Sequence, residues 1–191
     1  TCFSFHPRKL ICAGEGGAIT TNNNKWSKIL EVKLQHGAKI TKGIGLNFVD
    51  YGYNYRFTEL QSVMGIQQLK KISKIIKSRN KIRSQYIKHL SKNGLIPQKI
   101  NSNVFFNNQT IVFRMKNKNL RNGLINFLKK KKIETTIGYY SLSNTFYYKK
   151  KYKQNRVNSK LLQDTTIALP CYENMNYKLV IKMINSYINK S

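Results

Sequence analysis

The chain has 191 residues, of which 40% are hydrophobic and 12% aromatic. This composition suits one domain with a core, or part of a larger domain, and it excludes an intrinsically disordered chain. No apolar run approaches the roughly 18 residues that span a bilayer, and no signal peptide is visible, so we expect no membrane association. Three cysteines without a CxxC motif indicate reduced thiols and a cytoplasmic location.

The net charge of +28 would attract anionic partners such as nucleic acid. However, 28 of the 35 basic residues are lysine and only 7 are arginine, the residue that nucleic-acid surfaces use for bidentate contacts. The charges are also spread over the second half of the chain rather than gathered in one stripe. We therefore interpret them as solvated faces and expect no nucleic-acid partner, although a basic surface would help to attract a phosphorylated substrate.

The N-terminal part of the sequence predicts short elements joined by loops. Thr1–Phe5 and Gly17–Thr21 are predicted strands on either side of a turn-rich stretch. Residues 25–35 predict a short helix with Trp26 on its buried side. Residues 36–55 contain four glycines and predict a long connection, and loops of this length are usually functional or mobile.

A long helix is predicted from Thr58 to Leu90. Its first residues, Thr58–Gln61, fit a capping box, in which the threonine hydroxyl and the glutamine side chain each satisfy a backbone N–H. Apolar residues follow at helical spacing, and Asn93–Gly94 is expected to end the helix. A helix of this length must cross from one domain layer to another.

The remaining residues predict a small α/β unit. Thr110–Met115 and Ile133–Tyr139 are predicted strands, and between them Asn119 is expected to cap a helix over Leu120–Leu128. Asn176–Ile188 predicts a C-terminal helix. Strand, helix and strand in this order favour an open sheet backed by helices.

The stretch with the most chemical content is Ser4–Phe5–His6–Pro7–Arg8–Lys9, followed by Gly14–Glu15–Gly16–Gly17. A lysine that forms a Schiff base must point into a pocket and lose its proton, and a short loop between two strands offers such a place. The hydroxyl of Ser4 is near enough in sequence to hold a phosphate oxygen beside Lys9. By this chemistry alone, an ordinary solvated loop lysine explains the pattern as well.

These residues resemble the cofactor-lysine segment of the DegT-type aminotransferases, which use pyridoxal 5′-phosphate (PLP) and act on nucleotide-linked keto sugars. The segment Gly52–Tyr53–Asn54–Tyr55–Arg56–Phe57–Thr58–Glu59–Leu60–Gln61 resembles the family's second motif. The separation of this segment from the lysine is also shared with the family. Leu169–Pro170 is a weaker similarity. Two ordered motifs at a fixed separation are a specific signal.

The resemblance implies an α/β fold, namely the C-terminal portion of the PLP aminotransferase type I fold. Residues 1–56 would be the remnant of the PLP-binding large domain, residues 57–93 the long linking helix, and residues 94–191 the small C-terminal α/β domain. The first half of the family's fold, with the acid that pairs with the pyridine nitrogen, has no counterpart in this sequence. We therefore expect the chain to be a fragment that is inactive alone.

The resemblance also implies a role for each matching residue. Lys9 would form the Schiff base with PLP and carry a proton between substrate and cofactor. Ser4 would bind the cofactor phosphate, and Asn54 would reach that phosphate in the neighbouring subunit of a homodimer with shared active sites. Tyr53 and Arg56 would shape the substrate entrance.

Structural roles stay open for several of these residues. Asn54 also suits a turn at the start of a helix, and Arg56 also suits an ion pair with Glu59. By resemblance His6 would contact substrate or cofactor, whereas its sequence context fits a loop histidine without a chemical role.

The implied reaction transfers an amino group from glutamate to a nucleotide-linked keto sugar, as in polysaccharide biosynthesis. The sugar stays open, because residues 137–143 match the family's substrate-binding segment poorly. Two alternatives remain. A PLP-dependent sugar dehydratase would carry histidine in place of Lys9, and a non-catalytic basic nucleic-acid-binding module would be expected to show a known recognition motif, which this sequence lacks.

Overall fold

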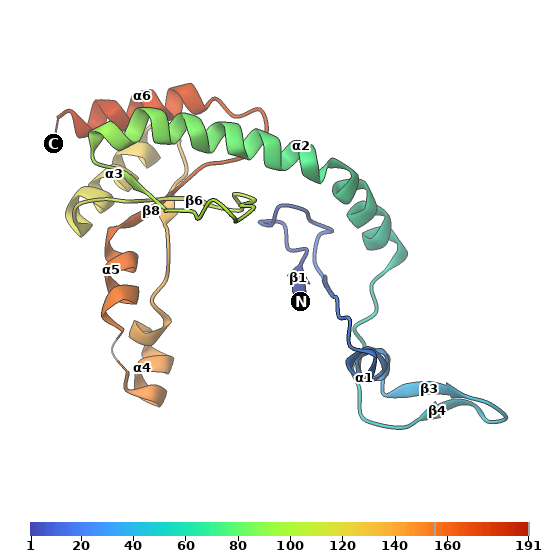
Figure 1. Cartoon of the computed structure of the whole chain (residues 1–191). Coiled ribbons are helices and arrows are strands. Elements are labelled where there is room, and N and C mark those ends of the chain that lie inside the picture. Colours follow the sequence, from blue (N-terminus) through green and yellow to red (C-terminus); the bar gives the residue numbers. More distant parts are fainter. Residues whose placement is uncertain (155, 191) are drawn as a thin grey trace. The chain divides into compact units, whose positions relative to one another are not determined.

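A computed structural model describes residues 1–154 and 156–190 (Figure 1). Residue contacts divide the chain into two units, Thr1–Ile72 and Ser73–Ser191. The long helix predicted as a link contributes residues to both units. The finer division into three parts at residues 56 and 93 stays a prediction.

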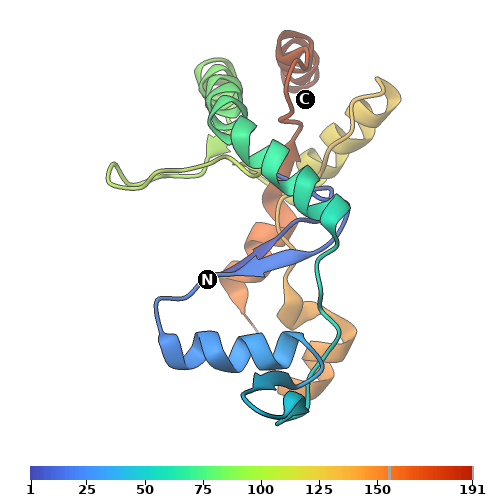
Figure 2. The same ribbon diagram turned by 90° about the vertical axis from the view of Figure 1, so that its right-hand side faces the viewer.

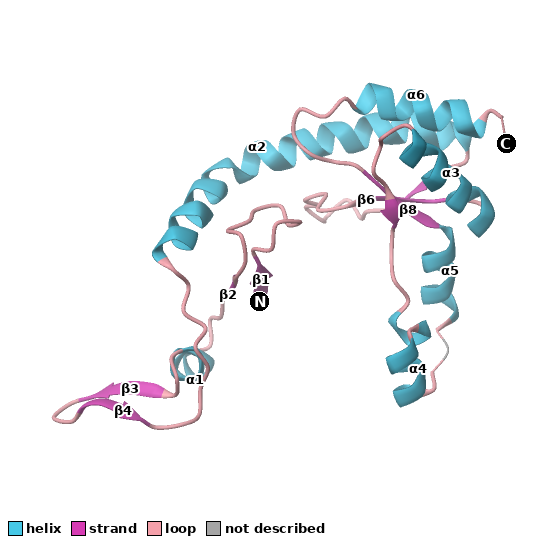
Figure 3. Ribbon diagram, turned by 180° about the vertical axis from the view of Figure 1, so that it is seen from behind, coloured by secondary structure: helices cyan, strands magenta, loops and turns pink. Residues whose placement is uncertain are grey.

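The first unit contains two antiparallel hairpins, a short helix and the start of the long helix. The predicted first strands are present as β1 (Cys2–Ser4) and β2 (Gly17–Ile19), which pair with each other. The predicted short helix is α1 (Asn24–Leu34). A second hairpin, formed by β3 (Ala38–Thr41) and β4 (Gly45–Phe48), lies next to α1 in Figure 3.

Two predictions for this unit are wrong. The stretch 36–55 is not one long connection, because Gly43 and Gly45 adopt φ angles of +80° and turn the chain into the β3–β4 hairpin. Trp26 is 58% exposed, and no residue of α1 is buried. An apolar helix face predicts burial only where another element covers it, and none of the described elements of this unit covers Trp26.

The long helix is α2 (Glu59–Leu90), which begins one residue after the predicted start at Thr58 and ends at the predicted Leu90. Its capping box is confirmed, because the Thr58 hydroxyl accepts from the Gln61 N–H at 3.3 Å and the Gln61 side-chain oxygen accepts from the Thr58 N–H at 3.2 Å. A 3₁₀ turn, η1 (Ser91–Asn93), and Gly94 at φ +83° end it. Leu60 near its start is 80% exposed, which leaves the first part of its apolar stripe uncovered.

The second unit is built around a four-stranded antiparallel sheet of order β5-β6-β8-β7. Its strands are β5 (Ile96–Pro97), β6 (Ile111–Arg114), β8 (Thr166–Leu169) and β7 (Thr136–Ile137). Every pair of neighbouring strands is antiparallel. The central strands β6 and β8 carry most of the buried residues, which is why short edge strands suffice here.

Helices cover one face of this sheet, as predicted from the order of elements. Figure 1 shows α6 (Tyr177–Ile188) running beside the second part of α2. Figure 2 shows this part of α2, together with α3 (Lys118–Lys130) and α6, on the same side of the sheet. The core joins these helices to Ile111, Phe113 and Ile167 of the sheet.

Smaller elements and two corrections complete the unit. A turn, η2 (Leu142–Asn144), and the helices α4 (Phe146–Tyr152) and α5 (Val157–Thr165) were not predicted. Asn117 rather than Asn119 caps α3, because its side chain accepts from the Leu120 N–H.

The predicted strand over Ile133–Tyr139 is shorter than expected. The N–H of Ile133 donates to the carbonyl of Leu128 at 2.9 Å, so this residue closes the end of α3 and does not begin a strand. Only Thr136 and Ile137 pair with β8. None of the helices in the described chain combines the length and the apolar character needed to cross a membrane.

Candidate active site

Lys9 lies in the loop that joins β1 to β2. Three backbone hydrogen bonds shape this loop: Phe5 N–H to Gly16 carbonyl at 2.9 Å, Ala13 N–H to Phe5 carbonyl at 3.0 Å, and Lys9 N–H to His6 carbonyl at 2.9 Å. The last bond closes a turn, and Lys9 is the residue at which this turn ends. Because the Lys9 side chain is exposed, its amine is accessible to a molecule in solution.

Ser4 and His6 lie on the same stretch of backbone as Lys9. Ser4, the last residue of β1, is exposed, and its hydroxyl oxygen accepts from the His6 N–H at 3.4 Å. The His6 ring accepts from the Arg8 N–H through Nδ1 at 3.1 Å, and its Nε2 lies 3.9 Å from Oε1 of Glu15. The hydrogen bond to Arg8 fixes the imidazole on its own side of the loop, and its contact with Glu15 is too long for a hydrogen bond.

The start of α2 and the residue before its cap contact the lysine loop. The side-chain amide of Gln61 donates to the Glu15 carbonyl at 3.3 Å, and the rings of Phe5 and Phe57 lie 5.9 Å apart. Gly16 has a φ of +111°, and a Cβ at this position would lie 2.4 Å from the Phe57 ring. The two sequence motifs therefore form one packed structure.

Sequence analysis missed these supporting residues. The sequence places Gln61 in the capping box and in the second motif without indicating its contact with Glu15, and it assigns no separate role to Phe57 or Gly16. The contact between them joins segments far apart in the chain, so no local periodicity indicates it. The glycine at positive φ is the one feature that a sequence can signal, through the residue type alone.

The second motif begins in an extended segment, Tyr51–Arg56, that is held against the end of α1. The Tyr53 and Tyr55 N–H groups donate to the carbonyls of Lys33 and Leu34, at 2.7 and 3.1 Å. The Tyr53 carbonyl accepts from the His36 N–H, and Asn54 forms a β-bridge with Gln35. These bonds fix the backbone of Asn54 without using its side chain.

This segment has one aromatic and one polar side. Alternate residues of an extended chain point to opposite sides. The rings of Tyr53 and Tyr55 stack at 5.0 Å, whereas Arg56 Nε donates to Asn54 Oδ1 at 3.0 Å. Tyr53 and Arg56, both predicted at the substrate entrance, therefore lie on opposite sides of the segment.

The side chain of Lys33 binds the residues at the start of this segment. Lys33 Nζ lies 2.8 Å from Asp50 Oδ2 and 3.1 Å from the centre of the Tyr51 ring. The hydrogen bond from Lys33, together with the one from the Tyr51 N–H, lowers the pKa of the Asp50 carboxyl below its usual value. Asp50 is thus a structural anion here.

The predicted site residues form two groups in the first unit. Ser4, His6 and Lys9 share the β1–β2 loop, and Asn54 and Arg56 share the polar side of the second motif. Among the residues that the structure describes, no hydrogen bond or ion pair joins the first group to the second. Nor do these residues include a cluster of three or more His, Cys, Asp or Glu that would hold a metal ion.

Comparison with known protein families gives an unambiguous match over nearly the whole chain. Residues 1–187 match the model of the DegT/DnrJ/EryC1/StrS aminotransferase family. The chain belongs to this family. Its members depend on PLP, so the cofactor and the class of enzyme predicted from the two motifs are confirmed at the level of the family.

Two curated relatives have names that refer to nucleotide-linked sugars. The UDP-4-amino-4,6-dideoxy-N-acetyl-beta-L-altrosamine transaminase of Campylobacter jejuni is 36% identical over 91 residues, which are 48% of this chain and 24% of that protein. The GDP-perosamine synthase of Vibrio cholerae is 28% identical over 191 residues, 98% of this chain and 45% of that protein. The chain thus spans about half, or less, of the length of the curated relatives that it matches.

Solved structures confirm the predicted fold. Helicobacter pylori PseC, an aminotransferase of pseudoaminic acid biosynthesis, superposes with a TM-score of 0.89 at 22% identity, over 100% of this chain and 53% of that chain. Streptococcus pneumoniae Spr1654 in its PLP-form gives a TM-score of 0.87 at 20% identity, over 100% of this chain and 52% of that chain. Both are structures of the PLP aminotransferase fold, of which this chain forms a part.

The residues present fit part of a PLP site. Lys9 offers an accessible amine for the cofactor aldehyde. Ser4 offers a hydroxyl whose oxygen accepts from His6, so its proton remains available for a phosphate oxygen. The amide oxygen of Asn54 accepts from Arg56, which leaves the amide N–H groups of Asn54 to donate to an anion.

Proposed function

We propose that the protein of which this chain is part transfers an amino group from glutamate to a nucleotide-linked keto sugar, with PLP as cofactor. The observation that carries the proposal is the placement of Lys9 at a turn end that the start of α2 holds in position. Membership of the DegT/DnrJ/EryC1/StrS family supports the amino-group transfer, and the names of the relatives support a nucleotide-linked sugar as acceptor.

Each side chain has a defined task in this proposal. Bound PLP supplies an aldehyde and an electron-withdrawing ring. Lys9 would hold the cofactor through its amine and afterwards move a proton with the same amine. Ser4 donates its hydroxyl to the phosphate, and His6, whose ring accepts from the Arg8 N–H, keeps the loop in the conformation that presents both groups.

The role of Lys9 can be tested on the full product of the gene that encodes this chain. We expect the wild type to shift the absorbance of PLP as the lysine bonds to it, and we expect Lys9→Ala to lose both this shift and the amine transfer. Lys39→Ala, a change of an exposed lysine in β3, serves as the matched control. A shift that survives in Lys9→Ala would remove Lys9 from the mechanism.

The same assay separates transamination from dehydration of the sugar. Transfer of an amine changes the mass of the sugar product differently from loss of water. We expect the aminated sugar because position 9 is a lysine and not a histidine. A dehydrated product without nitrogen would overturn the proposed reaction while leaving the cofactor assignment intact.

We also propose a homodimer whose two active sites each use both subunits. Asn54 and Arg56 present donors on one side of their segment, yet no hydrogen bond or ion pair among the described residues links them to Ser4 or Lys9. Exposed apolar side chains nearby need covering in a soluble assembly; those of β3, β4 and their turn are Ile40, Ile44, Leu46 and Phe48. Asn54 would then donate to the phosphate bound by the neighbouring subunit.

Co-expression of two inactive variants tests this sharing. In a mixture of Lys9→Ala and Asn54→Ala chains, half of the dimers are mixed, and each mixed dimer keeps one site with both residues intact. We expect about a quarter of wild-type activity from the mixture, although each variant alone is inactive. An inactive mixture that contains mixed dimers would show that both residues serve the same subunit's site.

A further inference from the structure

The four-stranded sheet has one face that the helices α2, α3 and α6 do not cover. Ile111, Phe113 and Ile167 point into the helical core, so the alternate residues of the same strands point the other way. The strand register places Arg114 between Ile96 and Thr166 on this second face.

A pocket of about 340 Å³ lies on the second face, entirely within the second unit. Most of its lining surface is apolar, and four side chains with polar groups line it as well: Gln98, Arg114, Tyr139 and Thr166. A mainly apolar hollow with a few polar groups is the usual form of a small-molecule site.

Arg114 is the chemically decisive residue of this pocket. It is exposed, and no hydrogen bond or ion pair engages its guanidinium group among the residues that the structure describes. In contrast, Arg79, Arg83 and Arg121 each donate to backbone carbonyls. A guanidinium group without a protein partner is suited to bind a carboxylate or phosphate through two parallel hydrogen bonds.

Specific interactions hold the other walls of the pocket. The Tyr139 hydroxyl donates to Gln98 Oε1 at 3.2 Å, which leaves the Gln98 amide N–H groups free to donate. Arg83 donates to the Gln98 carbonyl at 2.9 Å and so fixes the backbone of this wall. Gly138 donates to the Thr166 carbonyl at 3.1 Å, which fixes the residue before Tyr139.

Gly138 shows how closely the chain before Tyr139 approaches the neighbouring strands β6 and β8. A Cβ at position 138 would lie 2.5 Å from Val112 Cγ1 and 2.6 Å from Thr166 Oγ1. Only a glycine permits this approach of the β7 end to the neighbouring strands. The backbone before Tyr139 is therefore fixed by its packing against β6 and β8, and the Tyr139 side chain is fixed by its hydrogen bond to Gln98.

We propose that this pocket binds a small molecule that carries a carboxylate or phosphate group. Arg114 takes the anionic group, the Gln98 amide adds a donor, and the apolar walls with the Tyr139 ring hold the carbon skeleton. An acidic amino acid and a nucleotide both carry such a group. The proposal stands on the pocket alone and does not rest on the proposed aminotransferase reaction.

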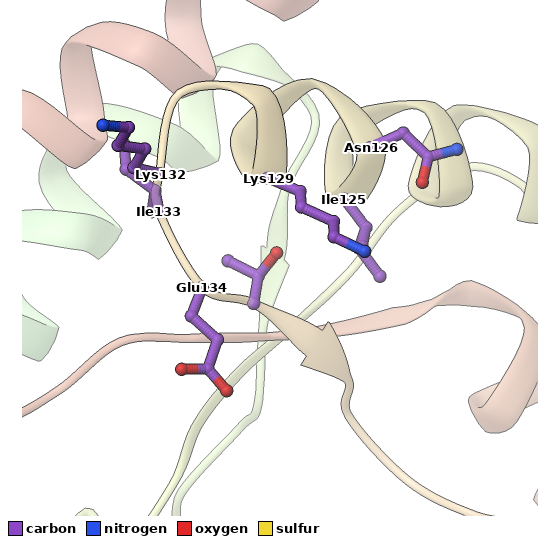
Figure 4. Close-up of a pocket in the computed structure, with 7 residues that line it drawn as sticks. Ile125, Asn126, Lys129, Lys132, Ile133 and Glu134 are labelled. Atoms are coloured by element: carbon purple, nitrogen blue, oxygen red, sulfur yellow. The ribbon is translucent and has the colours of Figure 1, made fainter.

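The larger hollow at the end of α3 lacks this convergence and supplies the control. It measures about 570 Å³ and contains two lysines, Lys129 and Lys132. Figure 4 shows their side chains leaving the chain in different directions, so their ammonium groups do not meet at one anion. Loss of Lys129 removes the same charge as loss of Arg114 without touching the proposed pocket.

The test is a calorimetric titration of the 191-residue chain with L-glutamate, with UMP and with uridine as the neutral analogue of UMP. We expect saturable binding of L-glutamate, of UMP or of both, with a dissociation constant that Arg114→Gln raises about tenfold or more. Arg114→Lys, which keeps the charge and loses the bidentate geometry, should also weaken binding, whereas Lys129→Gln should leave it unchanged.

The pattern of binding identifies the source of the anion. Binding of L-glutamate alone assigns a carboxylate ligand, and binding of UMP without uridine assigns a phosphate ligand. The proposal is overturned if neither anion binds, if uridine binds as well as UMP, or if Arg114→Gln and Lys129→Gln weaken binding equally. Circular dichroism of each variant checks that the fold is retained.

Discussion

Gly16 is a position at which a single added methyl group would disturb the contact between the lysine loop and the start of α2. Its φ of +111° lies in a region that residues with a Cβ avoid, which costs about 1–3 kcal/mol for Gly16→Ala. The new Cβ would also lie 2.4 Å from the Phe57 ring, and overpacking of this kind costs about 1–3 kcal/mol. The free energy of unfolding of the first unit should therefore fall by roughly 2–6 kcal/mol.

Gly14 provides the matched control for this prediction. It has a φ of +82°, and a Cβ there would meet nothing within 4 Å. Gly14→Ala therefore suffers backbone strain of about 1–2 kcal/mol without a clash. Both changes stiffen the unfolded chain by a similar amount, so this contribution cancels in the comparison. Gly16→Ala should cost at least about 1 kcal/mol more than Gly14→Ala.

Urea unfolding followed by hydrogen exchange at the amides of residues 1–72 measures these differences, because these amides report on the first unit. A Phe57→Leu background completes a double-mutant cycle. Without the ring, the extra cost of Gly16→Ala over Gly14→Ala should disappear. Equal costs in the wild-type background, or an extra cost that persists in Phe57→Leu, would refute the packing between the two motifs.

Three further outcomes follow from particular contacts. Thr58→Ala removes one half of the capping box and should lower the free energy of unfolding, measured in urea, by about 1 kcal/mol. Gln61→Glu keeps an acceptor for the cap but loses the donor to the Glu15 carbonyl. Its hydrogen exchange should therefore rise in the lysine loop and not at the start of α2. Burial raises the pKa of Tyr86 above its usual value, so the folded state binds the phenolic proton more tightly than the unfolded state does. The free energy of unfolding should therefore fall as the pH rises above about 10, and it should fall less in Tyr86→Phe when measured in urea. The 191-residue chain alone should bind PLP more weakly than about micromolar and show no turnover, because Ser4 supplies few of the donors that a phosphate needs; stoichiometric binding with turnover would contradict this.

Features that depend on neighbouring residues were predictable from the sequence. The capping box at Thr58 and the apolar spacing after it predicted α2 with its observed end at Leu90, because both signals act within a few residues. The cap of α3 was misplaced by two positions, since Asn117 and Asn119 are both good capping residues. Only the pairing of the Asn117 side chain with an N–H group decides between them.

Features that depend on distant partners were not predictable in the same way. The β3–β4 hairpin was not predicted, because its apolar and polar residues alternate over only four residues in each strand, and because Ile40 and Leu46 face solvent in the described chain and so belong to no core. The exposure of Trp26 has the same origin, since an apolar side chain does not reveal what covers it. For the site, the sequence indicated the members of both motifs, yet nothing in it indicated that Phe57 touches Gly16.

The contacts of Gln61 explain why the two motifs occur together. One side chain accepts from Thr58 to cap α2 and donates to the Glu15 carbonyl to hold the lysine loop. The start of the helix therefore adds a hydrogen bond from outside the loop to those that the loop forms within itself. A lysine that must hold a cofactor and then move a proton needs its backbone kept still while its side chain moves. In the proposed mechanism the first turn of α2 gives Lys9 that support, and the glycine at position 16 allows the loop to lie close to Phe57.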